Sequence, residues 1–333
     1  MNSGKSNGCK FFGFGLFAML LAVYLSAEAQ QPKKIPWVCY LIGSTASSST
    51  ESLKPFRERL RELGYIEGQN ISMESRYWDG KIERLPSLAA ELVRLDCDVI
   101  LTTGTEAAEA SKNATKAIPI VMAYSGDAVR LGIVADLARP GGNITGLTSI
   151  NAELSGKRLE LLKEVIPRLS RVALLWSPGN LNTKYLLNET ESAASSLRIT
   201  IQSVQMKVPS DIEEAFHGAT KKRAQALMLG GGGFISSHQK RIVELAAKNR
   251  LPGVYPNVQY VEVGGLMTYT EDRSEMLRRA AEYVDKILKG IKPADLPVER
   301  PNKFELVINL KTAKQIGLMI PPNVLARADK VIK

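Results

Sequence analysis

The chain has few of the residues on which most catalytic and metal centres depend. Its 333 residues include only two histidines, His217 and His238, and three cysteines, Cys9, Cys39 and Cys97, and these have no metal-ligand spacing. This scarcity argues against a zinc site, an iron–sulfur site and most histidine-dependent catalysis. No G-x-x-x-x-G-K-[ST] motif and no G-x-G-x-x-G with a placed acidic partner occurs, which argues against nucleotide binding. We therefore expect no enzyme, no metal and no cofactor.

Composition and charge place the chain among ordinary globular proteins. Hydrophobic residues make up 44% and charged residues 23%, and the length suits two domains. The net charge is +10, yet 44 basic residues are interleaved with 34 acidic ones, and the longest basic run is Lys221–Arg223. Such a dispersed charge is typical of solvated surface. We expect no nucleic-acid partner.

The first 29 residues resemble a secretory signal peptide. Lys5 and Lys10 precede an apolar stretch at 11–25, and the small residues Ala27 and Ala29 follow it. Fifteen apolar residues are fewer than the roughly 20 that span a bilayer, although an uncleaved membrane anchor is the alternative. We predict cleavage after Ala29 and a soluble periplasmic product, whose net charge falls to +9 because two lysines and one glutamate are removed.

Two cysteines remain in the mature chain. An oxidising compartment would allow Cys39 and Cys97 to pair. Both lie in apolar runs, VCYLI and LDCDVI, that are typical of a core strand and its approach. We therefore expect buried free thiols, with the disulfide as the alternative.

From residue 35 short apolar runs alternate with amphipathic helical stretches, which predicts an α/β fold with parallel sheets. The alternation restarts after a turn at 139–142, so we predict two similar lobes. The first comprises 30–145 plus 268–292, and the second 146–267 plus 293–333. Helices are also expected at 128–138 and, at the end of the chain, at 323–331. Two units joined by several connectors form a cleft that can open and close.

Candidate ligand contacts follow the predicted strands, because ligands of open α/β sheets bind at the carboxyl ends of the strands. The serine-rich loop after the first strand and the Thr102–Glu106 loop offer hydroxyls at helix starts, although Thr105 could simply cap its helix. Four consecutive glycines, 230–233, predict closely packed backbone near a ligand. The candidate contacts are Ser44, Thr45, Ser47, Ser48, Gly104, Thr105, Tyr124, Gly126, Asp127, Thr148, Ser177, Asn180, Gly231 and Tyr255.

Two residues of this set carry a more specific hypothesis. Asp127 follows a strand and could pair with a ligand ammonium, or could instead cap the helix expected at 128–138. Tyr124 could stack on an apolar ligand group.

Several sequence blocks together resemble the ABC transporter substrate-binding protein family. They include T-x-G-T-E-A-A, RPGGNITG at 139–146 and KFELVINLKTAK at 303–314, and the resemblance extends over about 32–332. It implies two Rossmann-like lobes of the type 1 periplasmic-binding-protein kind, three hinge crossings, and capture of a small ligand for a membrane permease. Two departures stand out: Ala128–Arg130 replaces a more usual proline-containing run, and glycines replace apolar residues near 231–234.

Two functional hypotheses follow. The first is a monomeric receptor of an ABC importer that closes over an amino-acid-like or aromatic carboxylate ligand and meets an ABC permease in the inner membrane. The alternative is a periplasmic ligand-sensing module that presents its closed form to a membrane sensor kinase. Neighbouring genes would distinguish the two, because a permease and an ATPase support transport whereas a lone kinase supports sensing.

Overall fold

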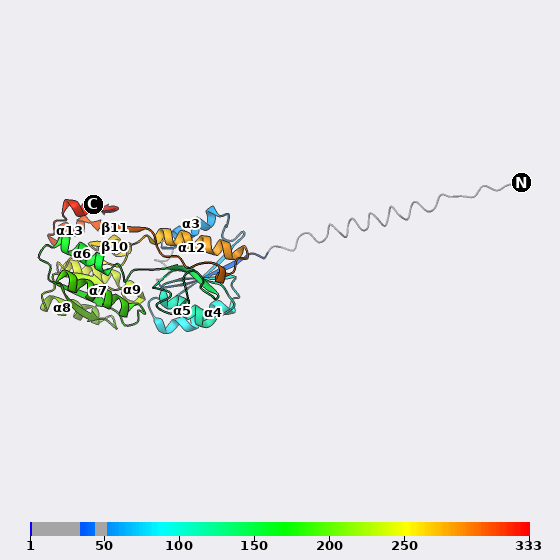
Figure 1. The fold of residues 1–333 in the computed structure, drawn as a ribbon, viewed down its shortest axis with the longest axis horizontal. Helices are drawn as coiled ribbons and strands as arrows, with labels where there is room; N and C mark the ends of the chain where they lie inside the picture. The colour runs from blue at the N-terminus through cyan, green and yellow to red at the C-terminus, as the bar shows by residue number, and fades with distance from the viewer. Residues whose placement is uncertain (2–33, 44–51) are drawn as a thin grey trace. The chain divides into compact units, whose positions relative to one another are not determined.

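The computed structural model describes residues 1, 34–43 and 52–333. The chain divides into two units, 1–35 and 36–333, and every helix and strand below belongs to the second unit (Figure 1). The predicted signal peptide beyond Met1, with its cleavage site after Ala29, lies outside the described residues. So do Cys9 and the candidate contacts Ser44, Thr45, Ser47 and Ser48.

The first lobe is built on a five-stranded parallel sheet in the order β2-β1-β3-β4-β5. Its strands are β1 (Trp37–Ile42), β2 (Ser72–Tyr77), β3 (Val99–Thr103), β4 (Ile120–Ser125) and β5 (Ile144–Thr148). The strands β1 and β3 are wholly buried apart from Trp37, as expected for a parallel sheet covered on both faces.

Helices cover both faces of this sheet (Figure 1). They are α3 (Lys54–Glu62), η1 (Ile82–Arg84), α4 (Leu85–Arg94), α5 (Thr105–Ala114) and α12 (Arg273–Leu288). On one face α3 and α12 pack on Val38, Tyr40 and Leu101, and on the other α4 and α5 pack on Leu41 and Ile100. The late helix α12 thus returns to the lobe formed by the start of the chain.

The second lobe is built on a seven-stranded sheet in the order β12-β11-β10-β9-β8-β6-β7. Its strands are β6 (Arg171–Trp176), β7 (Thr200–Gln205), β8 (Ala226–Leu229), β9 (Gly253–Tyr255), β10 (Met267–Glu271), β11 (Phe304–Asn309) and β12 (Lys330–Ile332). All neighbouring strands are parallel except β10 and β11. The expected α/β class with two largely parallel sheets is confirmed.

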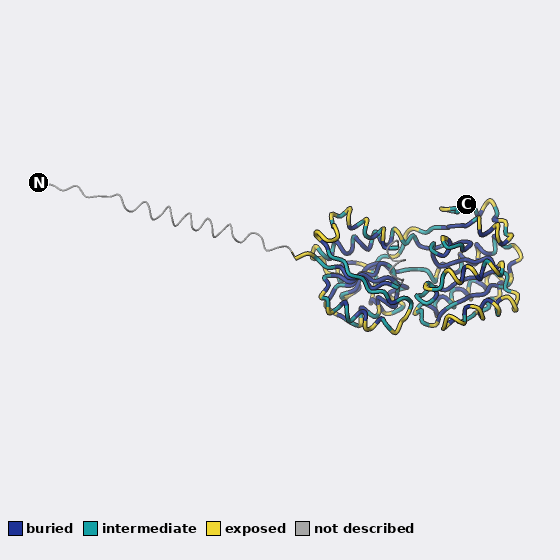
Figure 2. Tube along the Cα trace, turned by 180° about the vertical axis from the view of Figure 1, so that it is seen from behind, coloured by how far each residue is buried: buried dark blue, intermediate teal, exposed yellow. Residues whose placement is uncertain are grey.

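Buried residues concentrate in the strands of both sheets and on the inner sides of their helices (Figure 2). The remaining elements are α6 (Ser155–Val165), α7 (Thr183–Leu197), α8 (Asp211–Lys221), α9 (Gly233–Ser237), α10 (Gln239–Lys248), α11 (Val258–Glu262), η2 (Pro293–Asp295), α13 (Leu310–Ile316) and α14 (Pro322–Leu325). In the second lobe α6, α7 and α13 cover one face of the sheet, and α8 and α10 cover the other.

The chain passes between the lobes three times: after β5, after β10, and between α12 and β11. The lobe limits differ from the predicted ones. Residues 268–271 lie in β10 of the second sheet, whereas Leu296 and Val298 pack in the core of the first lobe. Alternation alone does not show on which sheet a connecting segment packs.

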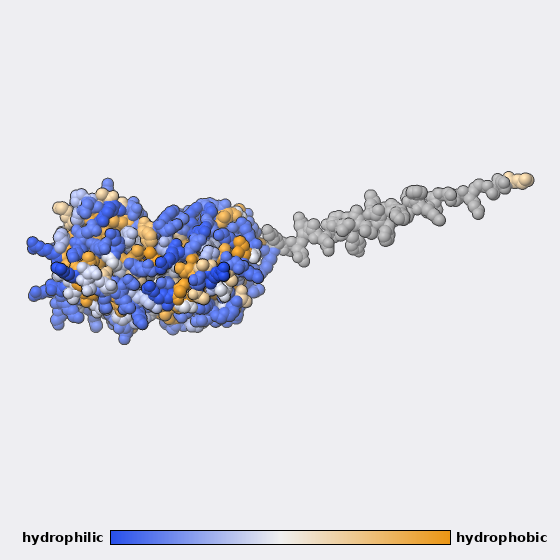
Figure 3. All heavy atoms as spheres, viewed as in Figure 1, coloured by the Kyte–Doolittle hydropathy of each residue, from blue (hydrophilic) through white to orange (hydrophobic). Residues whose placement is uncertain are grey.

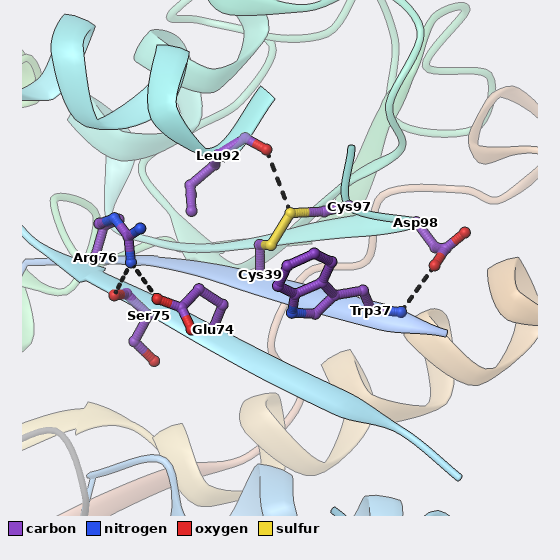
Figure 4. Close-up of a disulfide and its surroundings, with 8 residues drawn as sticks. All are labelled: Trp37, Cys39, Glu74, Ser75, Arg76, Leu92, Cys97 and Asp98. Atoms are coloured by element: carbon purple, nitrogen blue, oxygen red, sulfur yellow. Dashed lines mark hydrogen bonds and ion pairs between the residues drawn. A yellow bond between two sulfur atoms is a disulfide. The ribbon is translucent and has the colours of Figure 1, made fainter. Parts of the chain in front are cut away.

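The cysteine prediction is wrong, because Cys39 and Cys97 form a disulfide with a Cα–Cα distance of 6.0 Å (Figure 4). Cys39 lies on β1, and Cys97 lies two residues before the neighbouring strand β3, which pairs with β1 at Val38 and Val99. Sheet register thus brings the two buried side chains together. The apolar surroundings were correctly predicted, but they do not exclude a bridge between adjacent strands.

Among the described residues, the helix predicted at 128–138 is absent, and the one predicted at 323–331 is only partly formed. Residues 128–138 form turns, since Gly132 adopts a left-handed φ of 68° and the N–H of Ile133 returns to the carbonyl of Ala128. At the end of the chain only α14 is helical, and residues 330–332 form β12 on the otherwise open edge of β11. An edge strand with unpaired backbone groups outweighs the weak helical periodicity there.

The described residues contain no helix long and apolar enough to cross a bilayer. On the face in Figure 3, hydrophilic side chains cover most of both lobes, with apolar atoms in small patches.

Candidate functional site

A cavity of about 250 Å³ is lined by both lobes. The first lobe contributes residues that follow β2, β3 and β4, among them Trp78, Gly104 and Asp127. The second contributes residues that follow β6, β8 and β9, among them Asn180 and Gly231. The cavity therefore lies at the carboxyl ends of parallel strands, where ligands of α/β sheets bind.

The loop after β3 joins the two lobes. Gly104 has a φ of 94° and precedes α5, and Thr105 is the first residue of that helix. The Thr105 hydroxyl oxygen does not cap the helix; it accepts hydrogen bonds from the Gly126 N–H at 2.7 Å and from the Asn182 amide at 3.0 Å. Asn182 belongs to the second lobe, so this hydroxyl holds two strand-end loops and the opposite lobe together.

The Asp127 carboxylate already has a cationic neighbour. Its Oδ1 accepts a hydrogen bond from the Arg130 N–H at 3.1 Å, and its Oδ2 lies 3.5 Å from the Arg130 guanidinium. Arg130 also lies 3.8 Å from Glu189 and over the ring of Tyr185. Asp127 therefore caps a turn and not the predicted helix, whereas its pairing with a ligand ammonium stays a prediction, now for a carboxylate that already lies beside Arg130.

Two other charged side chains in the cavity have no ion-pair partner among the described residues. Glu106, in the first turn of α5, is only 8% exposed, and burial raises the pKa of its carboxyl although backbone N–H groups of Glu106 and Leu181 partly offset this. Arg273, the first residue of α12, lies with its guanidinium 4.7 Å from the centre of the Tyr124 ring. A carboxyl and a guanidinium, neither with an ion-pair partner in the described part of the chain, thus line one cavity.

Buried neutral groups in the cavity also lack partners. Trp78 Nε1, Ser125 Oγ and Asn257 Oδ1 line it and make no hydrogen bond within the described part of the chain. Asn257 is 4% exposed and follows β9 by two residues. A buried polar group without a hydrogen bond destabilises the folded protein. Such atoms in the wall of a cavity therefore indicate sites at which a ligand or water would form the missing hydrogen bonds.

The structure brings half of the predicted contacts together at the cavity. Gly104, Thr105, Tyr124, Gly126, Asp127, Asn180 and Gly231 line it, and the Asn180 amide donates to the carbonyl of Gly231 at 2.7 Å. Their contact with a ligand stays a prediction.

Three predicted residues lie outside the lining. The Thr148 hydroxyl is buried between Gly126 and Ala128, donating to the carbonyl of the first and accepting from the N–H of the second, each at 2.9 Å. The Ser177 carbonyl accepts from the Thr183 hydroxyl, so Ser177 shapes the start of α7. Tyr255 is 1% exposed and stacks on Tyr260 within the second lobe.

Sequence reasoning missed Trp78, Glu106, Arg273 and Asn257. Asn257 and Glu106 lay within loops that the strand-end argument had located, so the rule found the loops but selected other residues. Arg273 had no such signal, because it starts a helix that returns to the first lobe from late in the chain.

No group of three or more histidine, cysteine, aspartate or glutamate side chains in the described ranges is arranged to hold a metal ion.

Comparison with known proteins identifies the family to which this sequence is similar. A family model described as ABC transporter substrate binding protein matches residues 45–332. A curated tyrosine-binding protein of Clostridioides difficile is 26% identical over 271 residues, which cover 81% of this chain and 78% of that protein.

Solved structures agree with this match. A conserved domain protein from Vibrio cholerae superposes with a TM-score of 0.83 at 26% identity, covering 90% of this chain and 100% of that one. An ABC domain from Streptococcus pneumoniae in complex with L-Trp superposes with a TM-score of 0.82 at 26% identity, covering 89% of this chain and 99% of that one.

Proposed function

Because this chain belongs to the ABC transporter substrate-binding protein family, we propose that it captures a small amino-acid-like or aromatic carboxylate ligand for an ABC importer. The observation that carries the ligand class is the cavity between the lobes, lined by the Arg273 guanidinium and the Glu106 carboxyl, neither of which has an ion-pair partner within 34–43 and 52–333. The relatives described as tyrosine-binding and as complexed with L-Trp support the same class.

Arg273 is the proposed partner of the ligand carboxylate. A guanidinium binds a carboxylate through paired N–H donors, and the Tyr124 ring beneath it holds the group in place without using those donors. A closed cavity that keeps a cation without its anion costs free energy, so a carboxylate ligand would favour closure.

Glu106 is the proposed partner of a ligand ammonium, in the role first assigned to Asp127. Asp127 is compensated by Arg130, whereas Glu106 has no cation beside it in the described chain. A ligand ammonium would lower the pKa of Glu106 and make its ionised form favourable. Without such a ligand, burial favours the neutral acid.

Ligand capture is proposed to proceed by hinge closure. Three crossings connect the lobes, and side chains on opposite lobes already meet at Thr105 and Asn182. Bending at the crossings would open the cavity while both cores stay intact. We further propose export to the periplasm with cleavage after Ala29, action as a monomer, and delivery to an inner-membrane ABC permease.

Calorimetric titration tests the ligand class. The panel contains the twenty amino acids, aromatic acids, and for each amino acid its carboxamide and its deamino acid. We expect one-to-one binding of at least one acid, and weaker binding of the matching carboxamide. If no acid binds while hydrolase or isomerase assays show turnover, the proposal is wrong.

A further inference from the structure

The four glycines after β8 do not form a phosphate-binding motif. The packing of the last of them, Gly233, indicates a different role. A Cβ atom built on Gly233 would lie 2.1 Å, 2.6 Å and 2.9 Å from three ring atoms of Trp78. Carbon atoms do not approach so closely, so position 233 accommodates only glycine while the indole stays in place. Gly233 belongs to the second lobe, and Trp78 to the first.

Trp78 is held on its own lobe from several sides. Its backbone N–H donates to the carbonyl of Ile42, and its ring packs in the same buried cluster as Leu85 and Leu88 of α4. A Cβ on Gly43 would lie 3.3 Å from the ring. With 1% exposure, the indole has little room to turn away from an obstacle on the other lobe.

The backbones of Gly80 and Gly233 also approach each other beside the Trp78 ring. Gly80 has a φ of 73° in the turn that follows Trp78, and a Cβ there would lie 2.8 Å from the carbonyl carbon and oxygen of Gly233. The two lobes therefore approach each other at backbone distance beside the indole, which requires glycine on both sides.

We propose that Trp78 and Gly233 form the seat of closure, meaning the contact at which the two lobes meet when they close, and that position 233 is glycine in order to admit the indole. This inference rests on the proposed hinge closure. Trp78 also lines the cavity with its Nε1 unpartnered among the described residues, so the same side chain seals the cleft and faces the ligand space. A side chain at position 233 would hold the lobes apart without touching Arg273 or Glu106.

Closure can be measured without knowing the ligand. A Cβ on Gly126 of the first lobe would lie 2.3 Å from Asn182 Cγ of the second, so cysteines at these two positions would meet when the lobes close. The reference protein therefore carries Gly126→Cys and Asn182→Cys, and the rate of its cross-lobe disulfide formation under mild oxidant reports closure. The native Cys39–Cys97 bridge is buried and already oxidised.

Three variants are compared in this background. Gly233→Ala should slow cross-linking about tenfold or more, because a methyl group overlaps the indole. Gly218→Ala is the matched control, since a Cβ there meets nothing within 4 Å, and it should cross-link at the reference rate. Trp78→Leu combined with Gly233→Ala should recover most of the lost rate, because the shorter side chain makes room for the methyl group.

The outcomes separate this inference from the proposed function. If the Gly233→Ala variant cross-links at the reference rate, or if Trp78→Leu fails to rescue it, Trp78 and Gly233 do not form the seat. If the reference protein itself never cross-links, hinge closure fails, and the inference fails with it.

Discussion

The Glu271 carboxylate accepts a hydrogen bond of 2.6 Å from the Ser149 hydroxyl, and this contact joins two of the three crossings between the lobes. Glu271 ends β10 and is 1% exposed, and the same oxygen accepts the Ile150 N–H at 2.6 Å. Beside it the fully buried Arg158 donates to the Tyr269 carbonyl at 2.9 Å and to Asn151 Oδ1 at 2.7 Å. A buried charged network thus fixes the backbone from which the lobes would hinge.

Glu271→Gln is expected to lower the free energy of unfolding by about 2 kcal/mol, because hydrogen bonds to a buried charge are stronger than neutral ones. It should also change ligand affinity, since Ser149 to Asn151 line the cavity. Chemical denaturation and calorimetry measure the two effects.

Asp285→Asn is the matched control for this variant. The Asp285 carboxylate is also buried and accepts hydrogen bonds from Tyr65 and Lys289, but it lies on α12 away from the crossings. Equal changes in affinity for both variants would contradict a role specific to the hinge.

Arg273→Gln and Glu106→Gln should each weaken ligand binding by about ten- to a hundredfold, as expected for the loss of one charge-assisted contact. Arg273→Gln should abolish the preference for an acid over its carboxamide, and Glu106→Gln the preference for an amino acid over its deamino acid. Arg278→Gln and Glu109→Gln, exposed or half-exposed positions on the same two helices, should leave affinity unchanged. A larger loss from Asp127→Asn than from Glu106→Gln would restore Asp127 as the ammonium partner.

Loss of the Cys39–Cys97 bridge should lower the free energy of unfolding by about 4 kcal/mol, because it frees a loop spanning 58 positions in the unfolded chain. Urea denaturation with and without reductant measures the effect. A Cys39→Ala/Cys97→Ala variant serves as the control, because its midpoint should not respond to reductant. An identical midpoint for the native chain under both conditions would exclude a stabilising bridge.

Glu305 predicts a pH-dependent term in stability. Burial, reinforced by the nearby Asp272, raises the pKa of its carboxyl from 4.5 to about 7. Between these values the folded protein keeps a proton that the unfolded chain releases, so the free energy of unfolding falls as pH rises through this window. Because the side chain is partly solvated, we expect a term of about 1 kcal/mol. Denaturation profiles should show Glu305→Gln removing this decline; parallel profiles for the two proteins would contradict it.

The sequence was sufficient for the alternating architecture, because buried parallel strands and amphipathic helices leave strong local patterns. The buried strand β3 and the amphipathic helix α7 are examples. Prediction from the sequence failed where pairing between distant segments decides the structure. The edge of β11 recruits residues 330–332, and sheet register joins Cys39 to Cys97.

For the candidate site, the strand-end rule located loops that line the cavity, but it did not select all of the side chains that line it. Thr148 and Tyr255 make their contacts within one lobe and do not line the cavity, which the local sequence does not reveal. Arg273 reaches the cavity from a helix that returns to the first lobe late in the chain, whereas Trp78 directly follows β2, a strand end at which no candidate residue was predicted. The run of glycines at 230–233 is visible in the sequence, but the packing of Gly233 against Trp78 is visible only in three dimensions.

Native mass spectrometry of the purified protein mixed with a small-molecule extract of its host tests ligand capture most directly. The proposed function predicts that one small acid adds to the chain at one copy per protein and is released with its mass unchanged, and that Arg273→Gln loses it. No added mass with any compound, or release of a compound with an altered mass, would contradict it.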